Sequence, residues 1–292
     1  MIIDAHAHLW YRQCGRVNNG EVYDLGGGRS MFGGEIRQMM PPYLTDGINS
    51  AERFLANMDY AGVSGAVITQ EYIDGNQDAY LYQCRQENPQ RLRVCALYEE
   101  QPMRNLEGFD GIKLCAGRLA DPDLLHHIVP FETANAQGKF ISIDLADGDL
   151  QTGGLNEIAQ QFPDLKIAIG HFGMVTREGW LEQIRVAKNK NVFIESGGIT
   201  WLFHKEFYPY PSAVKAILEA ADLVGFEKLM WGSDYPRTMT AITYKMSLDF
   251  VQKSDQIPED SKALFLGENA KAFYGFGDLA VPEAIRNMVE DD

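Results

Sequence analysis

Short apolar runs alternate with helical patterns along most of the chain. The apolar runs predict strands over residues 1–8, 62–69, 91–97, 109–114, 139–145, 165–171, 191–195 and 228–232. Helical spacing and capping residues predict helices over 49–60, 75–87, 121–137, 154–162, 177–188, 211–223, 240–251 and 259–274. Several strands, such as 66–68 and 167–169, are apolar throughout, which is typical of buried parallel strands.

Helix boundaries are predicted from local signals. Asn49, with Glu52 three residues later, resembles a capping box at the start of the first helix. Asp121 before Pro122 predicts the start of the helix that ends near Gly138. The acidic tail from Gly277 is expected to pack as a final short helix.

Nearly every predicted strand is followed by a helix, which defines the fold class. This order over 292 residues predicts one α/β domain, residues 1–292, folded as a (β/α)8 TIM barrel. A doubly wound sheet is the main alternative. It would need a glycine-rich phosphate loop between an early strand and a helix, and the glycines at 26–28 have neither that spacing nor that context.

Residues 10–47 interrupt the repeat with a stretch rich in Gly, Asn, Met and Tyr that has no sustained periodicity. A long loop inside a compact domain is usually functional, so we expect it to cover the active site. A disordered insertion is the alternative, which the aromatic and methionine residues disfavour.

Composition narrows the choice of partners. The net charge is -15 and no basic run occurs, which argues against nucleic-acid and anionic-membrane surfaces and leaves a small molecule as the expected partner. The four cysteines form no zinc-binding spacing, and Cys95 and Cys115 are expected to be buried. No signal peptide or membrane span is evident, so a cytoplasmic location is expected. A homo-oligomer would be compatible with this composition.

Polar side chains gather where the predicted strands end, which is where barrel enzymes carry their active sites. His6 and His8 point to the same side of the first strand, about 7 Å apart along the chain. The other polar residues at strand ends are Lys113, Asp144, His171, Glu195 and Asp234.

These residue types suit a divalent metal ion, with zinc as the first candidate. Asp234 could bind the ion or take a proton from its bound water. Lys113 is either a substrate cation or a structural ion-pair partner of Asp144 or Glu195. Arg237 is a second candidate for binding an anionic group, and His204, after the seventh strand, is a candidate substrate contact.

Three motifs carry a family resemblance. They are Ile3-Asp4-Ala5-His6-Ala7-His8, Gly170-His171-Phe172-Gly173 and Trp231-Gly232-Ser233-Asp234-Tyr235-Pro236. In this order they resemble the amidohydrolase superfamily, and within it the amidohydrolase-related branch. The resemblance implies a barrel of the metal-dependent hydrolase type, with His6, His8 and Asp234 as metal ligands and His171 as a ligand or catalytic group.

Asp144 departs from this pattern, because many relatives carry a metal-binding histidine at the end of the fifth strand. Asp144 could still be a ligand of the ion. The departure also fits the metal-independent lactonases of the branch, so the sequence is compatible with a metal-dependent and with a metal-independent site. By analogy with other branches, a carboxylated Lys113 bridging two ions is a further alternative.

The sequence thus leaves three hypotheses. The first is a metal-assisted hydrolase of a small carboxylated or sugar-acid substrate, most simply a lactone, with Asp234 and His171 as catalytic groups. The second is a non-oxidative decarboxylase of an aromatic or unsaturated acid, with His171 as proton donor. The third is a binding protein without enzymatic activity, which the clustering at strand ends disfavours.

Overall fold

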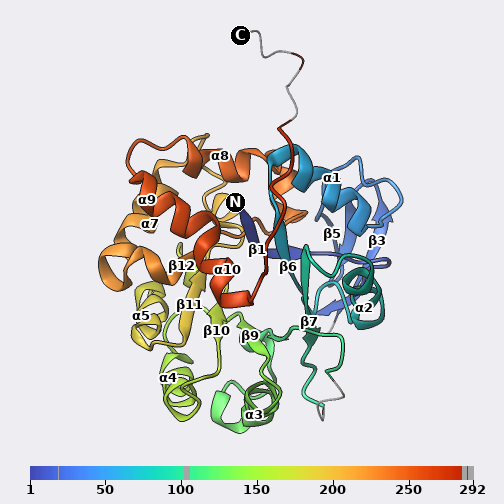
Figure 1. Cartoon of the computed structure of the whole chain (residues 1–292). Coiled ribbons are helices and arrows are strands. Elements are labelled where there is room, and N and C mark those ends of the chain that lie inside the picture. Colours follow the sequence, from blue (N-terminus) through green and yellow to red (C-terminus); the bar gives the residue numbers. More distant parts are fainter. Residues whose placement is uncertain (19, 102–105, 285–287, 289–292) are drawn as a thin grey trace.

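Eight parallel strands close into a barrel with helices around it (Figure 1). The structure, a computed structural model, describes residues 1–18, 20–101, 106–284 and 288. The first and last strands meet where Ala5 N donates to Trp231 O (2.9 Å) and His8 N donates to Tyr235 O (2.8 Å). The predicted (β/α)8 barrel is therefore confirmed.

Each barrel strand lies within its predicted range. The strands are β1 (Ile3–His8), β6 (Gly65–Thr69), β7 (Leu92–Leu97), β8 (Gly111–Leu114), β9 (Phe140–Ile143), β10 (Ile167–Ile169), β11 (Val192–Glu195) and β12 (Leu229–Met230). The helices are α1 (Ala51–Ala61), α2 (Asp78–Glu87), α3 (Ile128–Ala136), α4 (Thr152–Gln161), α5 (Trp180–Arg185), α6 (Ile199–Leu202), α7 (Pro211–Val224), α8 (Met246–Gln252), α9 (Glu259–Ala263) and α10 (Asn269–Tyr274).

Two predicted helix starts were wrong. Ser50, not Asn49, caps α1, and its side chain accepts from Arg53 N. The side-chain amide of Asn49 donates to His8 O (2.6 Å), which holds it at β1. Asp123, not Asp121, caps a 3-10 turn over residues 124–127, and α3 begins only at Ile128.

Two C-terminal predictions also need correction. The range 240–251 is not one helix: a 3-10 turn over Arg237–Thr240 ends at its first residue, and α8 begins only at Met246. Residues 277–284 form no helix, and residues 285–287 and 289–292 lie outside the described part of the chain.

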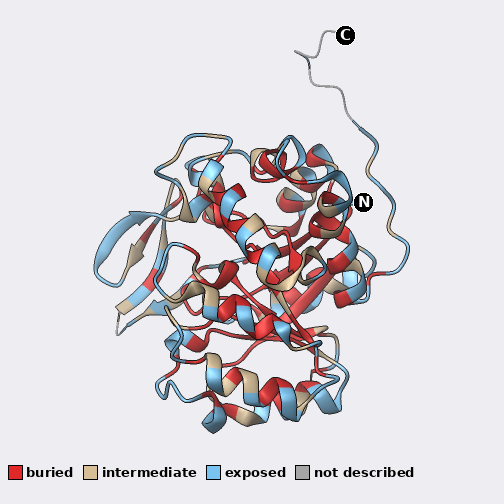
Figure 2. Ribbon diagram, turned by 90° about the vertical axis from the view of Figure 1, so that its left-hand side faces the viewer, coloured by how far each residue is buried: buried red, intermediate tan, exposed pale blue. Residues whose placement is uncertain are grey.

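Residues 10–47 are more regular than expected. They contain the antiparallel strands β2 (Cys14–Val17), β3 (Gly20–Gly26), β4 (Arg29–Phe32) and β5 (Glu35–Gln38), in that spatial order. We call this four-stranded sheet the meander. Its strands are too short to show a clear alternation in the sequence, and Figure 2 shows exposed strands standing out on the left of the molecule.

The meander is attached to the barrel through the loop that follows β6. Arg16 N donates to Tyr72 O (2.7 Å) and Cys14 N donates to Asp74 O (3.1 Å). Gly15 lies between these two residues, and a Cβ at this position would collide with the backbone of Tyr72 and Ile73. This attachment fixes the meander beside the carboxyl ends of the barrel strands.

Apolar side chains fill two regions of the molecule. One is the space between the sheet and the helices, and the other is the amino end of the barrel. Inside that end, Ile3, Val67 and Met230 belong to one cluster with Phe273 of α10. Cys95 and Cys115 are buried, as predicted. The opposite end of the barrel is therefore the one left for polar groups.

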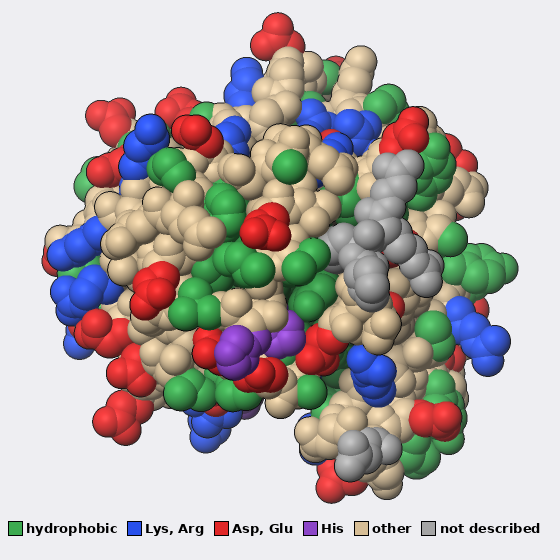
Figure 3. All heavy atoms as spheres, turned by 90° about the horizontal axis from the view of Figure 1, so that it is seen from below, with side chains coloured by type: hydrophobic (Ala, Val, Ile, Leu, Met, Phe, Trp, Pro, Cys, Tyr) green, Lys and Arg blue, Asp and Glu red, His purple; other side chains and the backbone are tan. Residues whose placement is uncertain are grey.

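Two surface properties agree with the composition. The face in Figure 3 carries acidic and basic side chains interspersed, without a continuous basic area. Among the described residues, no helix combines the length and apolar character needed to cross a membrane.

Candidate active site

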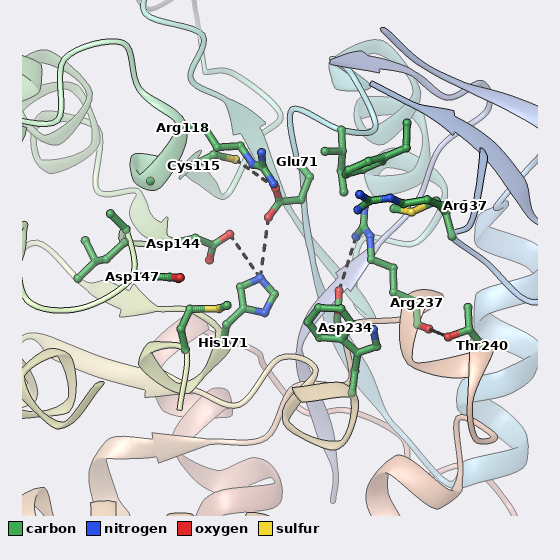
Figure 4. A pocket seen from close by; sticks show the side chains of 18 of the residues that line it. Arg37, Glu71, Cys115, Arg118, Asp144, Asp147, His171, Asp234, Arg237 and Thr240 are labelled. Carbon is green, nitrogen blue, oxygen red and sulfur yellow. Dashed lines mark hydrogen bonds and ion pairs between the residues drawn. The ribbon is translucent and has the colours of Figure 1, made fainter. Parts of the chain in front are cut away.

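A cavity of about 640 Å³ opens at the carboxyl ends of the barrel strands (Figure 4). Its charged lining residues are Arg37, Glu71, Arg118, Asp144, Asp147, His171, Asp234 and Arg237. Its apolar lining includes Phe32, Met39, Ile73, Leu145, Met174 and Trp201. This volume and mixed lining are typical of a small-molecule site.

His6, His8 and Asp234 meet below this cavity. His6 Nε2 lies 3.0 Å from His8 Nε2, which lies 3.0 Å from Asp234 Oδ1. All three residues are buried. The strand geometry explains the pair of histidines, since alternate residues of β1 share a face, and Asp234 follows the neighbouring strand β12.

A buried carboxylate orients the first of these histidines. His6 Nδ1 lies 2.6 Å from Glu195 Oε1, at the end of β11. This contact leaves His6 Nε2 to face the other two side chains, as in the carboxylate–histidine pairs that support metal ligands. Gly197 makes the packing feasible, because a Cβ there would lie 2.7 Å from His6 Cγ.

His171 forms a second polar centre in the cavity wall. Its Nδ1 lies 2.9 Å from Gly197 O, which can only accept, so Nδ1 carries a proton. Its Nε2 lies 3.6 Å from Asp144 Oδ2 and 3.9 Å from Glu71 Oε1 (Figure 4). The ring can therefore present an Nε2 proton to the cavity.

The two carboxylates favour the protonated form of this ring. Burial opposes a charged imidazole, but the Asp144 carboxylate and then Glu71 outweigh it and raise the pKa of His171 well above its ordinary value. Burial likewise opposes an ionised Asp144, yet Lys113 and His171 hold the pKa of that carboxyl well below its usual range. The protonated form of His171 is thus the favoured one.

Both His171 and Asp234 have left-handed backbone conformations, with φ of 51° and 57°. Such conformations cost of order 1–3 kcal/mol for residues with side chains and persist where the surrounding structure enforces them. Their occurrence at two residues of one site indicates that the turns after β10 and β12 are shaped to aim these side chains.

Arg237 lies between two buried carboxylates. Its Nη2 donates to Asp74 Oδ2 (2.6 Å), and its Nη1 lies 3.6 Å from Asp234 Oδ1. Burial favours a neutral Asp234, but the hydrogen bond from His8 and the charge of Arg237 lower the pKa of this carboxyl below its usual range. Burial and the charge of Arg237 lower the pKa of His8 well below its ordinary value, so His8 is neutral.

The cluster of His6, His8 and Asp234 fits a divalent ion. One ligand atom from each lies within 4.8 Å of the others. Two facing imidazole nitrogens need a cation or a shared proton between them, and two nitrogens with one carboxylate suit zinc. Asp144 also falls within such a distance of His6 and His171, although its Oδ2 lies 2.6 Å from Lys113 Nζ.

Two other predicted site residues, Lys113 and His204, do not line the cavity. Lys113 is fully buried beside Asp144 and does not line the cavity, so the ion-pair alternative is the one found. His204 is exposed, bonds Trp201 O and also lies outside the cavity lining.

Sequence reasoning missed Glu71, Asp74 and Arg118. Glu71 and Asp74 follow β6, and the strand-end rule that found the other acids would have found Glu71 if applied to that strand. Arg118 lies in a short 3-10 turn after β8, and no pattern in the sequence marks it.

The family model described as Amidohydrolase matches residues 3–276. No match to this chain is found among curated proteins.

Solved structures share this architecture at low sequence identity. A protein from Acinetobacter baumannii, described as a probable 2-pyrone-4,6-dicarboxylic acid hydrolase with citric acid bound, is 18% identical, with TM-score 0.67 over 94% of this chain and 99% of that one. An amidohydrolase from Burkholderia multivorans with bound zinc is 13% identical, with TM-score 0.68 over 95% and 100%. The 5-carboxyvanillate decarboxylase of Sphingomonas paucimobilis is 19% identical, with TM-score 0.54 over 79% and 84%.

Proposed function

Since the chain belongs to the amidohydrolase family, and is thus an enzyme, we propose that it hydrolyses a lactone of a small carboxylated acid with the help of one divalent ion. One observation carries this proposal. Asp234, which belongs to the cluster with His6 and His8, lines the same cavity as His171 and Arg118.

His6, His8 and Asp234 would hold the ion, and zinc is our first candidate. When bound, such an ion polarises a carbonyl and lowers the pKa of bound water to about 7. Asp144 could contribute a further ligand oxygen, in competition with its ion pair to Lys113.

The protein side chains then move two protons. Asp234 Oδ2, which accepts no hydrogen bond from any described residue, takes a proton from the attacking water. The water oxygen bonds to the lactone carbonyl carbon, and the ring C–O bond breaks. His171 Nε2 gives its proton to the departing alkoxide, so lactone and water become one hydroxy acid.

Arg118 is the proposed anchor for a substrate carboxylate. Its side chain is exposed in the cavity and has no partner among the described residues, whereas Arg237 is held by Asp74. The chain has a net charge of -15, so an unpaired guanidinium is a local positive charge in an acidic protein. Such a group favours the binding of an anionic ligand. The 2-pyrone-4,6-dicarboxylic acid hydrolase fold match agrees with this assignment.

A lactone panel with and without ring carboxylates tests the proposal. We expect acid release from carboxylated lactones, one divalent ion per chain, and a KM raised about tenfold or more by Arg118→Gln. Arg185→Gln, an exposed arginine of α5 paired with Glu182, is the matched control and should change nothing. Full hydrolysis by protein with well under one ion per chain would contradict the metal-assisted mechanism.

Non-oxidative decarboxylation is the second candidate, because a protonated His171 could equally deliver its proton to carbon. The fold match to 5-carboxyvanillate decarboxylase is in line with it. The same panel should include aromatic carboxylic acids. Release of CO2 without lactone hydrolysis would replace the first proposal with this one.

A further inference from the structure

Asp74 takes no part in the chemistry proposed above, yet it binds the charged group nearest to Asp234. Arg237 Nη2 donates to Asp74 Oδ2 at 2.6 Å, while Arg237 Nη1 is 3.6 Å from Asp234 Oδ1. The side chains of these three residues are largely buried: the exposed fraction is 13% for Arg237, 3% for Asp74 and 5% for Asp234. Little water is available to screen these charges, so the arginine must divide its attraction between the two carboxylates.

The second Asp74 oxygen is tied to the meander. Gln13 Nε2 donates to Asp74 Oδ1 (3.2 Å), and Ser30 Oγ of β4 donates to Gln13 Oε1 (2.6 Å). All three residues are buried. Both oxygens of Asp74 are therefore committed, which holds the carboxylate in one orientation toward Arg237.

Without that carboxylate, Asp234 would be the one carboxylate of the described residues within 4 Å of the Arg237 guanidinium. Arg237 Nη1 lies 3.6 Å from Asp234 Oδ1, and a small movement of the guanidinium would pair these two atoms. Asp234 Oδ1 is the same atom that now lies 3.0 Å from His8 Nε2. The contact would withdraw this oxygen from the cluster of His6, His8 and Asp234. Asp74 thus competes with Asp234 for one cation.

We propose that Asp74 is a positioning residue that keeps Arg237 from capturing Asp234 and so preserves the ligand geometry of the metal cluster. The proposal rests on the metal-assisted function above and extends it. The chain from Ser30 through Gln13 to Asp74 connects the meander to this role.

The test measures binding of cobalt(II) alone, whose visible absorption reports the geometry of its ligands. Asp74→Asn should weaken cobalt affinity about ten- to hundred-fold and alter the absorption spectrum. The double variant Asp74→Asn/Arg237→Gln removes the competing cation and should recover most of the affinity. Asp110→Asn, which breaks a carboxylate–arginine pair remote from the site, is the matched control and should bind cobalt like the wild type.

Each outcome decides the proposal. Unchanged cobalt binding in Asp74→Asn overturns it, as does equal loss in the single and double variants, which would mean a merely structural role. A wild type that binds no divalent ion overturns it too. If the cobalt results hold but no lactone is hydrolysed, the proposed function is wrong while the positioning role stands.

Discussion

At the scale of the residue, His171 combines three constraints. Its Nδ1 is fixed by Gly197 O, its Nε2 faces two carboxylates, and its backbone is left-handed at φ 51°. Together they set the protonation state, the orientation and the position of one ring. A single histidine in the sequence conveys none of these constraints.

Replacing this ring tests its assigned role. His171→Gln is expected to lower kcat about 10²- to 10⁴-fold with a small change in KM, because the variant binds substrate but cannot supply a proton. Steady-state kinetics on a carboxylated lactone measure the effect. His204→Gln, at an exposed position outside the cavity, should leave both constants unchanged, and equal losses in the two variants would count against the assignment.

Asp144 gives a pH dependence of stability. Its pKa is depressed in the folded protein, mainly by Lys113 and His171 against the cost of burial. Between the folded and unfolded pKa values the unfolded chain binds more protons, so stability rises with pH in that window. The contribution is full above the unfolded value of about 4 and is lost as pH falls through the folded value.

Denaturant unfolding of metal-free protein measures this contribution. Asp144→Asn should cost about 3–5 kcal/mol at neutral pH, since Lys113 is left buried without its partner. The difference from wild type should shrink as the pH falls below about 4. A difference that grows in that range would contradict the depressed pKa.

At the scale of the element, the barrel strands were predictable and the meander was not. Strands such as β6 and β10 are continuous apolar runs, because both of their faces are covered. The strands of the meander have four to seven residues and one open face, and β5 is exposed throughout. The pairing of the meander strands depends on their docking to the loop after β6, and no local sequence pattern predicts this docking.

Gly15 is the position at which this docking can be disrupted. Gly15→Ala places a Cβ against the Tyr72 and Ile73 backbone, so the meander should detach while the barrel core stays intact. We expect faster proteolysis within residues 14–38 and a raised KM. The Tm should change little, because the barrel core stays intact. Gly153→Ala in α4, where a Cβ meets nothing within 4 Å, is the control and should alter neither property.

At the scale of the whole molecule, the order of the predicted strands along the chain was enough to locate most of the candidate site. The strand-end rule placed His6, His8, His171 and Asp234 at one end of a barrel, and the structure brings these four together. It could not decide between the two roles of Lys113, because the partner of a buried charge depends on side-chain packing. The same limit applies to Arg118, whose position depends on a turn.

The proposed metal cluster of His6, His8 and Asp234 joins the two strands at which the barrel closes, so removal of the ion should affect the entire fold. Dialysis against a chelator is expected to lower Tm, and added zinc to restore it, because a ligand that binds only the folded state stabilises it by mass action. Calorimetry with and without zinc measures the shift. Asp234→Asn should show a much smaller response, and an equal response in both proteins would place the ion elsewhere.

The closure between β1 and β12 also has a consequence for synthesis of the chain. His6 and His8 are translated more than two hundred residues before Asp234, which follows the two-residue strand β12. Until Asp234 has been added, a nascent chain therefore carries this pair of histidines without the carboxylate that completes the cluster. Chains that end before Asp234 therefore lack one member of the candidate site.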